Sequence, residues 1–404
     1  MKRFITLYLL CFSTLICAED SALFEVKEAW FTQAITPNKP EKGTFNQQYF
    51  ILTPTGLAEN TQVNIHFVLG NENDATAQRL IDIYKAYGSP QDTIFAIAEH
   101  RGYGQSVTAD TQQKPSYVSL DAAVHDNARL IKHLRQQYQG KWIVNGCSYG
   151  GSLAIRYAEL HPDTFDVAIS SSAVIEYPAL MPQYADMVNK ELDADLVTRL
   201  AKHIEALYQQ KDDPEKVRQM ELVHMLITGL AQVGTMQGLV PIAQQLSGLP
   251  TPEFVAQLDK MLPQAGHNWA NGMSSFTVPA DSTKRNWYTW KYQMCYELGT
   301  FWTGYPYAMT KQDYVERCRN TFGEYPPYLN AEPKSFKASL KNVSKPIIVV
   351  SGGKDPWINV GVKPDHRYTN IEYVYGENWH HCPDKDTADA TAQVKLKLHQ
   401  LLRE

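Results

Sequence analysis

The sequence predicts an α/β fold in which a doubly wound, mainly parallel sheet is interrupted by a helical insertion. Strand-like and helix-like segments alternate between about residues 45 and 174. From about 175 to 335 the apolar residues recur with helical spacing, and no convincing strand pattern appears. Strand patterns resume at Pro346. Such alternation is typical of parallel sheets with helices on both faces.

The expected strands are short apolar runs, and the expected helices show amphipathic periodicity. The strands cover residues 48–52, 63–69, 93–98, 142–145, 165–170, 346–350 and 371–375. The helices of the sheet region cover 77–87, 120–138, 152–161 and 391–402. Those of the insertion cover 192–209, 214–230 and 251–262. We expect the insertion to form a cap above the carboxyl ends of the strands; the alternative is an independent domain.

The first residues have the pattern of a cleavable signal peptide, so the expected units are 1–18 (leader), 19–174 and 336–404 (the two parts of the sheet domain) and 175–335 (cap). Lys2 and Arg3 precede an apolar stretch, and cleavage is expected after Ala18. A lipoprotein site at Cys17 is the rival, but Ile16 is bulky for such a site. The prediction is a secreted or periplasmic protein whose mature chain does not span a membrane.

Composition limits the classes of partner and cofactor. Loss of Lys2 and Arg3 with the leader takes the net charge from −5 to −7, and no basic cluster is present, which argues against nucleic acid. Four of the six cysteines follow the leader, an even number as expected in an oxidising compartment. No cofactor and no metal site is expected. The oligomeric state stays open, a homodimer included.

Gly146-Cys147-Ser148-Tyr149-Gly150 fits the G-x-S-x-G pattern and lies between an expected strand and an expected helix. In this strand–turn–helix context the serine lies on a tight turn with its hydroxyl above the sheet. The five-residue pattern alone is common, and its placement makes Ser148 a candidate nucleophile.

An acid and a histidine follow in the order that such a nucleophile needs. Asp355 follows the strand expected at 346–350, and His380 and His381 follow the strand expected at 371–375. The alternatives are a turn-forming Asp355 and a surface or metal-binding histidine pair. Adjacent histidines do not easily bind one ion, and no nearby spacing completes a ligand set. We therefore predict a triad of Ser148, Asp355 and His381.

The triad chemistry requires an oxyanion hole in addition to the three side chains. The imidazole takes the serine proton, and the carboxylate fixes the imidazole tautomer. One oxyanion donor is expected from the N–H of Tyr149 and a second from the loop after the strand at 63–69, near Asn71.

Several motifs resemble those of the serine peptidase family that includes lysosomal Pro-X carboxypeptidase and dipeptidyl peptidase II. In chain order they are Gly70-Asn71-Glu72, Glu99-His100-Arg101-Gly102-Tyr103-Gly104-Gln105-Ser106, Ser148-Tyr149-Gly150-Gly151, Tyr292-Gln293-Met294-Cys295-Tyr296-Glu297, Gly353-Lys354-Asp355-Pro356-Trp357 and His381-Cys382-Pro383-Asp384. They cover essentially the whole mature chain. The chain departs from the family in carrying Asn145-Gly146-Cys147 before the serine and in a shorter cap.

The resemblance implies an α/β-hydrolase fold with a helical cap and a secreted serine exopeptidase acting on short peptides after proline. It also favours His381 over His380 as the base. The segment from His100 to Ser106 is similar to that of proline iminopeptidases. The alternatives are therefore a proline iminopeptidase or tripeptidyl aminopeptidase, or a serine esterase or lipase on the same fold.

Further residues have both a functional and a structural interpretation. Glu72 could bind a peptide α-amine or be a solvated loop carboxylate. Trp290, Trp302 and Trp357 could line a proline pocket or belong to the core. For Glu99, His100 and Arg101, a buried ion pair bracing the loop is favoured over recognition of the substrate terminus.

The cysteines allow two bridges. The resemblance implies a disulfide between Cys295 and Cys318. Cys147 and Cys382 each adjoin a candidate triad residue, so a second bridge is geometrically possible, but both could stay free.

Overall fold

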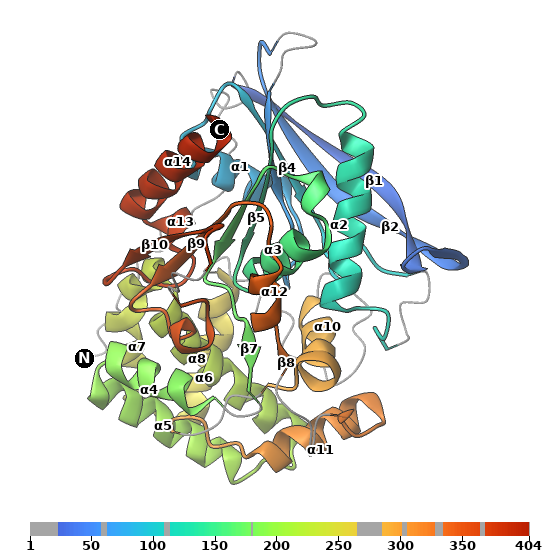
Figure 1. Cartoon of the computed structure of the whole chain (residues 1–404). Helices are drawn as coiled ribbons and strands as arrows, with labels where there is room; N and C mark the ends of the chain where they lie inside the picture. Colours follow the sequence, from blue (N-terminus) through green and yellow to red (C-terminus); the bar gives the residue numbers. More distant parts are fainter. Residues whose placement is uncertain are drawn as a thin grey trace.

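The computed structural model describes residues 23–57, 63–108, 114–178, 181–264, 285–300, 305–327, 334–363 and 368–403. The expected leader and Trp302 lie outside these ranges. The central sheet has the strand order β1-β2-β4-β3-β5-β6-β9-β10 (Figure 1). Its strands are β1 (Phe24–Thr36), β2 (Lys39–Pro54), β3 (Asn64–Val68), β4 (Thr93–Ala98), β5 (Trp142–Cys147), β6 (Val167–Ser171), β9 (Ile347–Gly352) and β10 (Ile371–Gly376). All neighbours from β4 to β10 are parallel, as predicted.

Side chains of the central strands are buried on both faces of the sheet. Phe67 and Val144 are fully buried in the core on one face, while Val68 and Ile143 belong to the core on the other. Such continuous apolar runs are what a parallel sheet covered on both sides requires. This explains why β3, β4, β5 and β9 could be located from the sequence.

Helices cover both faces of the sheet (Figure 1). One face packs against α2 (Leu120–Leu134), α3 (Tyr149–Leu160) and α12 (Lys337–Lys341). The other packs against α1 (Ala77–Ala86) and α14 (Ala388–Arg403), with α13 (Pro383–Asp386) beside them. The starts of α1 and α2 follow their side-chain caps, since Thr76 accepts from the Arg79 N–H and Ser119 from the Ala122 N–H.

The first hairpin was missed by the sequence analysis. Instead of a single short strand at 48–52, β1 and β2 form a long antiparallel pair, and β2 pairs antiparallel with β4. Much of β1 is exposed or half-buried, so it lacks the apolar run that indicated the central strands. The predicted ends also shift: α2 ends at Leu134, and α3 begins at Tyr149, directly after the candidate nucleophile.

The segment between β6 and β9 is mainly helical, and its two ends meet. β7 (Glu176–Tyr177) pairs antiparallel with β8 (Lys334–Ser335), at the positions expected for the boundaries of the cap. The helices between them lie together below the sheet in Figure 1. They are α4 (Pro182–Glu191), α5 (Ala194–Tyr208), α6 (Pro214–Gln232), α7 (Val240–Leu246), α8 (Thr251–Gln264), α10 (Arg285–Gln293) and α11 (Lys311–Phe322). A π-helical turn, Met294–Leu298, continues α10.

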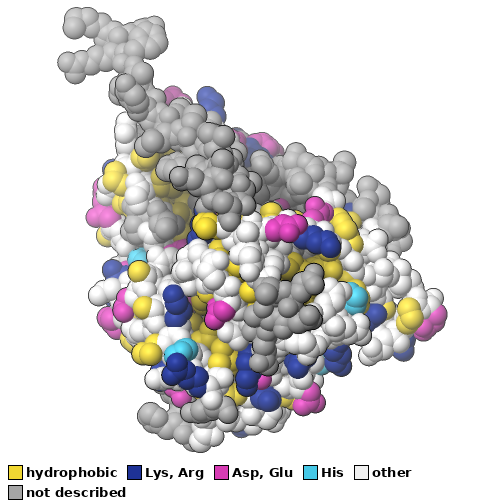
Figure 2. Space-filling model, turned by 90° about the horizontal axis from the view of Figure 1, so that it is seen from above, with side chains coloured by type: hydrophobic (Ala, Val, Ile, Leu, Met, Phe, Trp, Pro, Cys, Tyr) yellow, Lys and Arg dark blue, Asp and Glu magenta, His cyan; other side chains and the backbone are white. Residues whose placement is uncertain are grey.

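Helices α4, α7, α10 and α11 were not predicted. These helices are shorter than α5 and α6, and two of them begin at or near a proline, so their apolar residues repeat over too few turns to give a clear helical pattern. No helix in the described ranges is both long and apolar enough to span a membrane. Among the coloured residues of the face in Figure 2, acidic and basic side chains are interspersed.

Candidate active site

Ser148 lies on the turn between β5 and α3 in a strained conformation. Its backbone has φ 60° and ψ −125°, a region that costs a serine energy. A Cβ on Gly146 would lie 1.8 Å from the carbonyl oxygen of Gly150, and a Cβ on Gly150 would lie 2.5 Å from that of Gly70. Only glycine allows these approaches, which is the reason for the small residues of the G-x-S-x-G pattern.

The structure brings Asp355 and His381 together. Both carboxylate oxygens of Asp355 lie 2.9 Å from Nδ1 of His381, and both side chains are buried. A carboxylate only accepts, so Nδ1 carries the proton and Nε2 is the basic nitrogen. Nε2 is buried and has no hydrogen-bond partner among the described residues. It is therefore the ring atom available to take a proton from a nucleophile.

The loop that carries His381 is fixed to several parts of the fold. The His381 N–H donates to the carbonyl oxygen of Gln232 in cap helix α6 at 3.1 Å. The Cys382 N–H donates to Oγ of Ser172 at 2.9 Å. A cavity of about 290 Å³ opens beside the loop and is lined by Gly234, His380, His381, Pro383, Asp386 and Thr387. Substrate could therefore approach the histidine between the loop and the cap.

The structure contains the disulfide that the resemblance implied and also the second bridge, which the sequence left open. Cys147 is bridged to Cys382, with Cα atoms 5.7 Å apart, and Cys295 to Cys318, with Cα atoms 5.8 Å apart. Cys147, His381 and Cys382 form the one group of three metal-ligand side chains found in the described ranges. Because both sulfurs are engaged in a bridge, they do not supply thiolate ligands in this state.

The loop expected to supply the second oxyanion donor lies against the turn at residues 146–150 that carries Ser148, called here the nucleophile elbow. The contact between Gly150 and the Gly70 carbonyl places Asn71 beside the start of α3. The Asn71 side chain is held by Arg79, whose Nη1 donates to Oδ1 at 2.7 Å. The two residues predicted to donate, Tyr149 and Asn71, thus come from the elements that meet at Ser148.

Glu72, next along this loop, is not a solvated carboxylate. Its Oε2 is buried and has no hydrogen-bond partner in the described part of the chain. Burial raises the pKa of the Glu72 carboxyl, while a hydrogen bond to its own backbone and the charges of Arg79, His381 and Lys385 oppose that shift. A buried carboxylate oxygen without a hydrogen-bond partner is costly unless a ligand completes it.

Two of the three predicted tryptophans are placed near the candidate triad. Trp290 packs its ring edge-on against Tyr149, with centroids 5.3 Å apart. Trp357 donates from Nε1 to Gln232 Oε1 at 2.8 Å and packs against Tyr184 at 4.9 Å. Both rings are half-buried, so each is partly core and partly available to a ligand.

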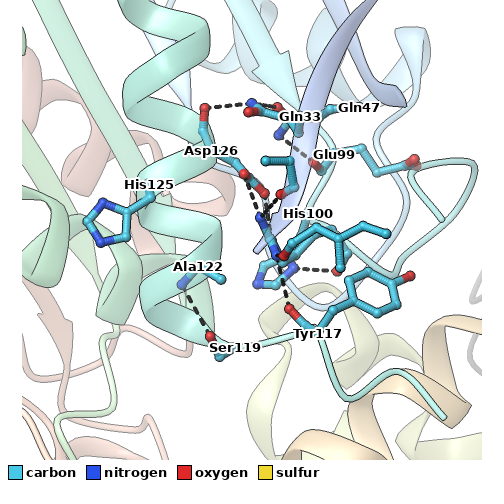
Figure 3. A network of polar contacts seen from close by, with 12 residues as sticks. Gln33, Gln47, Glu99, His100, Tyr117, Ser119, Ala122, His125 and Asp126 are labelled. Atoms are coloured by element: carbon cyan, nitrogen blue, oxygen red, sulfur yellow. Dashed lines mark hydrogen bonds and ion pairs between the residues drawn. The ribbon is translucent and has the colours of Figure 1, made fainter. Parts of the chain in front are cut away.

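The segment from Glu99 to Arg101 braces the fold. Arg101 is fully buried and makes a bidentate pair with Asp126 of α2, with both N–O distances 2.7 Å. Gln33 of β1 also donates to the Asp126 backbone, and Gln47 of β2 donates to the Glu99 backbone (Figure 3). Buried groups matched in this way stabilise a loop and are not available for a substrate.

The Tyr149 hydroxyl belongs to a hydrogen-bond network that reaches the cap. His100 Nδ1 lies 2.8 Å from the Arg101 carbonyl oxygen and must donate, so its Nε2 accepts from the Tyr149 hydroxyl at 3.2 Å. Burial lowers the pKa of His100 to about 3, which keeps this ring neutral. Gln293 Nε2 donates to the Tyr149 oxygen at 2.8 Å and to Glu297 at 2.7 Å.

The same network reaches the returning end of the cap. The Tyr103 hydroxyl donates to Gln293 Oε1. Glu297 accepts from the Leu120 N–H at the start of α2 and from Lys334 in β8. Every donor and acceptor of the Gln293 amide is matched, so the direction of each bond is determined. Elbow, helix α2 and the returning end of the cap are thereby joined.

Comparison with known proteins shows what part of this chain is similar to. A family model described as serine carboxypeptidase S28 matches residues 37–218. A putative serine protease of Caenorhabditis elegans, F56F10.1, is 28% identical over 175 residues, which are 40% of this chain and 31% of the relative. The thymus-specific serine protease of Homo sapiens is 25% identical over 174 residues, 41% of this chain and 34% of the relative. Over these residues the chain is similar to serine peptidases of the S28 family. It matches only about a third of the length of these relatives.

Solved structures confirm that this chain has the α/β-hydrolase fold. A proline iminopeptidase of Mycobacterium smegmatis superposes with a TM-score of 0.51 at 14% identity, over 93% of this chain and 99% of that one. VinJ superposes with a TM-score of 0.50 at 14% identity, over 92% and 98%. At this identity the likeness concerns the fold alone.

The sequence analysis gave no role to two glutamines that the structure places at the site. Gln293 lies within the family-like motif at residues 292–297, so the sequence marked its position but did not indicate that it bonds to Tyr149. Gln232 lies at the end of α6 in an otherwise ordinary amphipathic helix, and only tertiary structure brings it to His381 and Trp357.

Replacing Tyr149 by Phe should weaken both stability and turnover. The change leaves the ring and the backbone N–H but strands the Gln293 amide, which should lower the free energy of unfolding by about 1–3 kcal/mol. We expect kcat to fall roughly tenfold, because the residue that carries the predicted oxyanion donor loses its anchor.

Tyr157→Phe is the matched control. Tyr157 lies on the same helix, and its hydroxyl pairs with Thr164, which keeps a second bond to the His161 carbonyl oxygen. Urea denaturation and steady-state kinetics on both variants check the prediction. Equal kcat for the two would show that the network does not support catalysis.

Proposed function

We propose that the peptidase is an exopeptidase that cleaves short peptides after proline through an acyl-enzyme on Ser148. The observation that carries the proposal is the buried Asp355–His381 pair, whose loop is bridged to the residue before Ser148. A positive-φ serine, an oriented imidazole and a buried carboxylate are the parts that serine acyl transfer needs.

In this mechanism Ser148 Oγ attacks the carbonyl carbon of the scissile bond while His381 Nε2 takes its proton. Asp355 holds the Nδ1–H and stabilises the imidazolium that forms. The N–H groups of Tyr149 and Asn71 stabilise the oxyanion. His381 then protonates the leaving amine, and a water molecule, activated by the same nitrogen, hydrolyses the ester.

The preference for proline is supported by the aromatic residues around the triad. Proline has a fixed φ and, when it is joined to a preceding residue, no N–H. A suitable pocket is therefore apolar and makes no demand on that N–H. The rings of Tyr149, Trp290 and Trp357 come from the turn at Ser148, the cap and the loop of Asp355, and we propose that they form such walls.

Export belongs to the same proposal. The expected leader predicts a secreted or periplasmic enzyme, and the two disulfides suit an oxidising compartment.

Loss of any triad side chain should abolish turnover. Ser148→Ala, Asp355→Ala and His381→Ala should each lower kcat on the order of a thousandfold or more, and double variants should be no worse than the worst single one. His380→Ala, next to the base, should cost far less. Kinetics on folded variants measure this. An inactive His380→Ala with an active His381→Ala would reverse the histidine assignment.

A substrate panel tests the specificity. Ala-Pro and Lys-Pro amide reporters, and blocked peptides ending in Pro-X, are compared with Phe and Arg reporters and with fatty-acyl esters. We expect proline reporters, and next to them alanine ones, to be hydrolysed at least about tenfold faster. Activity confined to esters would instead support the esterase alternative.

Glu72 bears on which end of the peptide is recognised. Its buried, unpartnered Oε2 lies near His381, where the ammonium group of a free amino terminus would offset its burial. We therefore propose that the enzyme acts from the amino terminus and that Glu72 binds the α-amine.

Glu72→Gln should lower kcat/KM only for substrates with a free amino terminus. A charge-assisted bond contributes about 2 kcal/mol, so kcat/KM for a free Lys-Pro reporter should fall roughly thirtyfold. The N-acetylated reporter should be a poor substrate of both proteins and should change little.

Asp386→Asn is the control for a general field effect, because Asp386 also interacts with His381 and lines the cavity. The Asp386→Asn substitution should change kcat/KM of free and N-acetylated reporters by the same factor. Faster cleavage of blocked peptides ending in Pro-X than of free Lys-Pro reporters would point to the carboxypeptidase mode.

A further inference from the structure

The disulfide between Cys147 and Cys382 joins the immediate neighbours of the two residues that must exchange a proton. Cys147 is the last residue of β5 and precedes Ser148. Cys382 follows His381 in the loop after β10. The two cysteines are 235 residues apart in sequence, yet their Cα atoms lie 5.7 Å apart, a distance that suits a bridge.

The sulfur atoms also lie against the catalytic ring. A ring nitrogen of His381 and the two Sγ atoms are all within 4.8 Å of one another. The hydrogen bonds of His381 and of the Cys382 N–H reach Asp355, the Gln232 carbonyl and the Ser172 hydroxyl. Those contacts orient the histidine relative to β9, the cap and β6. The bridge differs from them because it reaches β5, the strand that carries the nucleophile.

We propose that this bridge is a positioning element that sets the approach of His381 to Ser148, and that its reduction switches the peptidase off. The proposal rests on the proposed triad. Proton transfer needs heavy atoms at about 3 Å, and a displacement of about 1 Å can cost a hundredfold in rate. Reduction leaves the fold and the remaining contacts of the loop in place but removes the direct tether.

The chemistry of the switch is thiol–disulfide exchange with a dithiol reductant. A thiolate of the dithiol attacks one sulfur of the bridge and forms a mixed disulfide, and its second thiol resolves it. The two cysteine sulfurs each gain one electron and one proton, and the dithiol becomes a disulfide. Reoxidation restores the tether.

The second bridge provides a matched control within the same chain. Cys295 and Cys318 join the π-helical turn to α11 inside the cap, where they are surrounded by Tyr288, Tyr292, Tyr296 and Phe322. Neither cysteine adjoins a candidate triad residue. Loss of this bridge alters the cap without untying the nucleophile from the base.

The first test compares two double variants with wild type. Cys147→Ala/Cys382→Ala should lower kcat at least about tenfold on an Ala-Pro reporter, with KM changed less than about threefold, and should slow labelling by a fluorophosphonate in parallel. Cys295→Ala/Cys318→Ala should keep kcat within about threefold. A folded Cys147→Ala/Cys382→Ala variant with wild-type kcat would overturn the proposal. Failure of the proposed function is separate, because it would appear as activity in Ser148→Ala.

The second test needs no variant and applies even if the alanine protein does not fold. Native enzyme is treated with dithiothreitol, and alkylation with peptide mapping shows which bridge has opened. EDTA is present throughout, because two freed thiols and the His381 ring could bind Zn²⁺ and inhibit for another reason. Activity should fall in step with opening of the Cys147–Cys382 bridge and return on reoxidation. Full activity with that bridge open would refute the proposal.

Discussion

The carboxylate of Asp355 is almost completely buried, and the rest of the site is arranged around its compensation. It accepts from Nδ1 of His381 and from the backbone N–H of Trp357. A buried carboxylate without such partners would be costly, so the loop after β9 and the loop after β10 can meet in only one way. That meeting fixes the histidine tautomer and leaves Nε2 as the acceptor. Because β9 lies beside β6, the Asp355–His381 pair is at the carboxyl end of the central strands, where Ser148 also lies.

The cap is integrated with the sheet domain through buried polar contacts. Gln232 of α6 holds the backbone of His381 and the ring of Trp357, and Gln293 at the end of α10 holds the hydroxyl of Tyr149. Each glutamine touches a residue next to, or within, the candidate triad. Through these matched hydrogen bonds the cap directly contacts residues of the candidate site.

The central strands and the triad order could be predicted because they follow local rules. A strand buried on both faces must be apolar throughout, and a nucleophile elbow must have small residues where backbones touch. The hairpin of β1 and β2 obeys no such rule, since its exposure depends on which neighbours cover it. The short cap helices could not be predicted either, because which of their side chains are buried also depends on the elements packed against them. Arg101 could be interpreted as a brace or a substrate ligand until its partner, Asp126 on α2, was known.

By itself, the sequence determined the fold class and the tight glycine turn, and it predicted the chain order of the proposed nucleophile, acid and base, because each depends on residue type and spacing along the chain. Only the tertiary structure decided that Cys147 and Cys382 are joined, that Oε2 of Glu72 is buried without a hydrogen-bond partner among the described residues, and that Gln293 reaches Tyr149. These features depend on distances between residues that are far apart in sequence. Such distances are set by the packing of whole elements, which no local pattern of residues records.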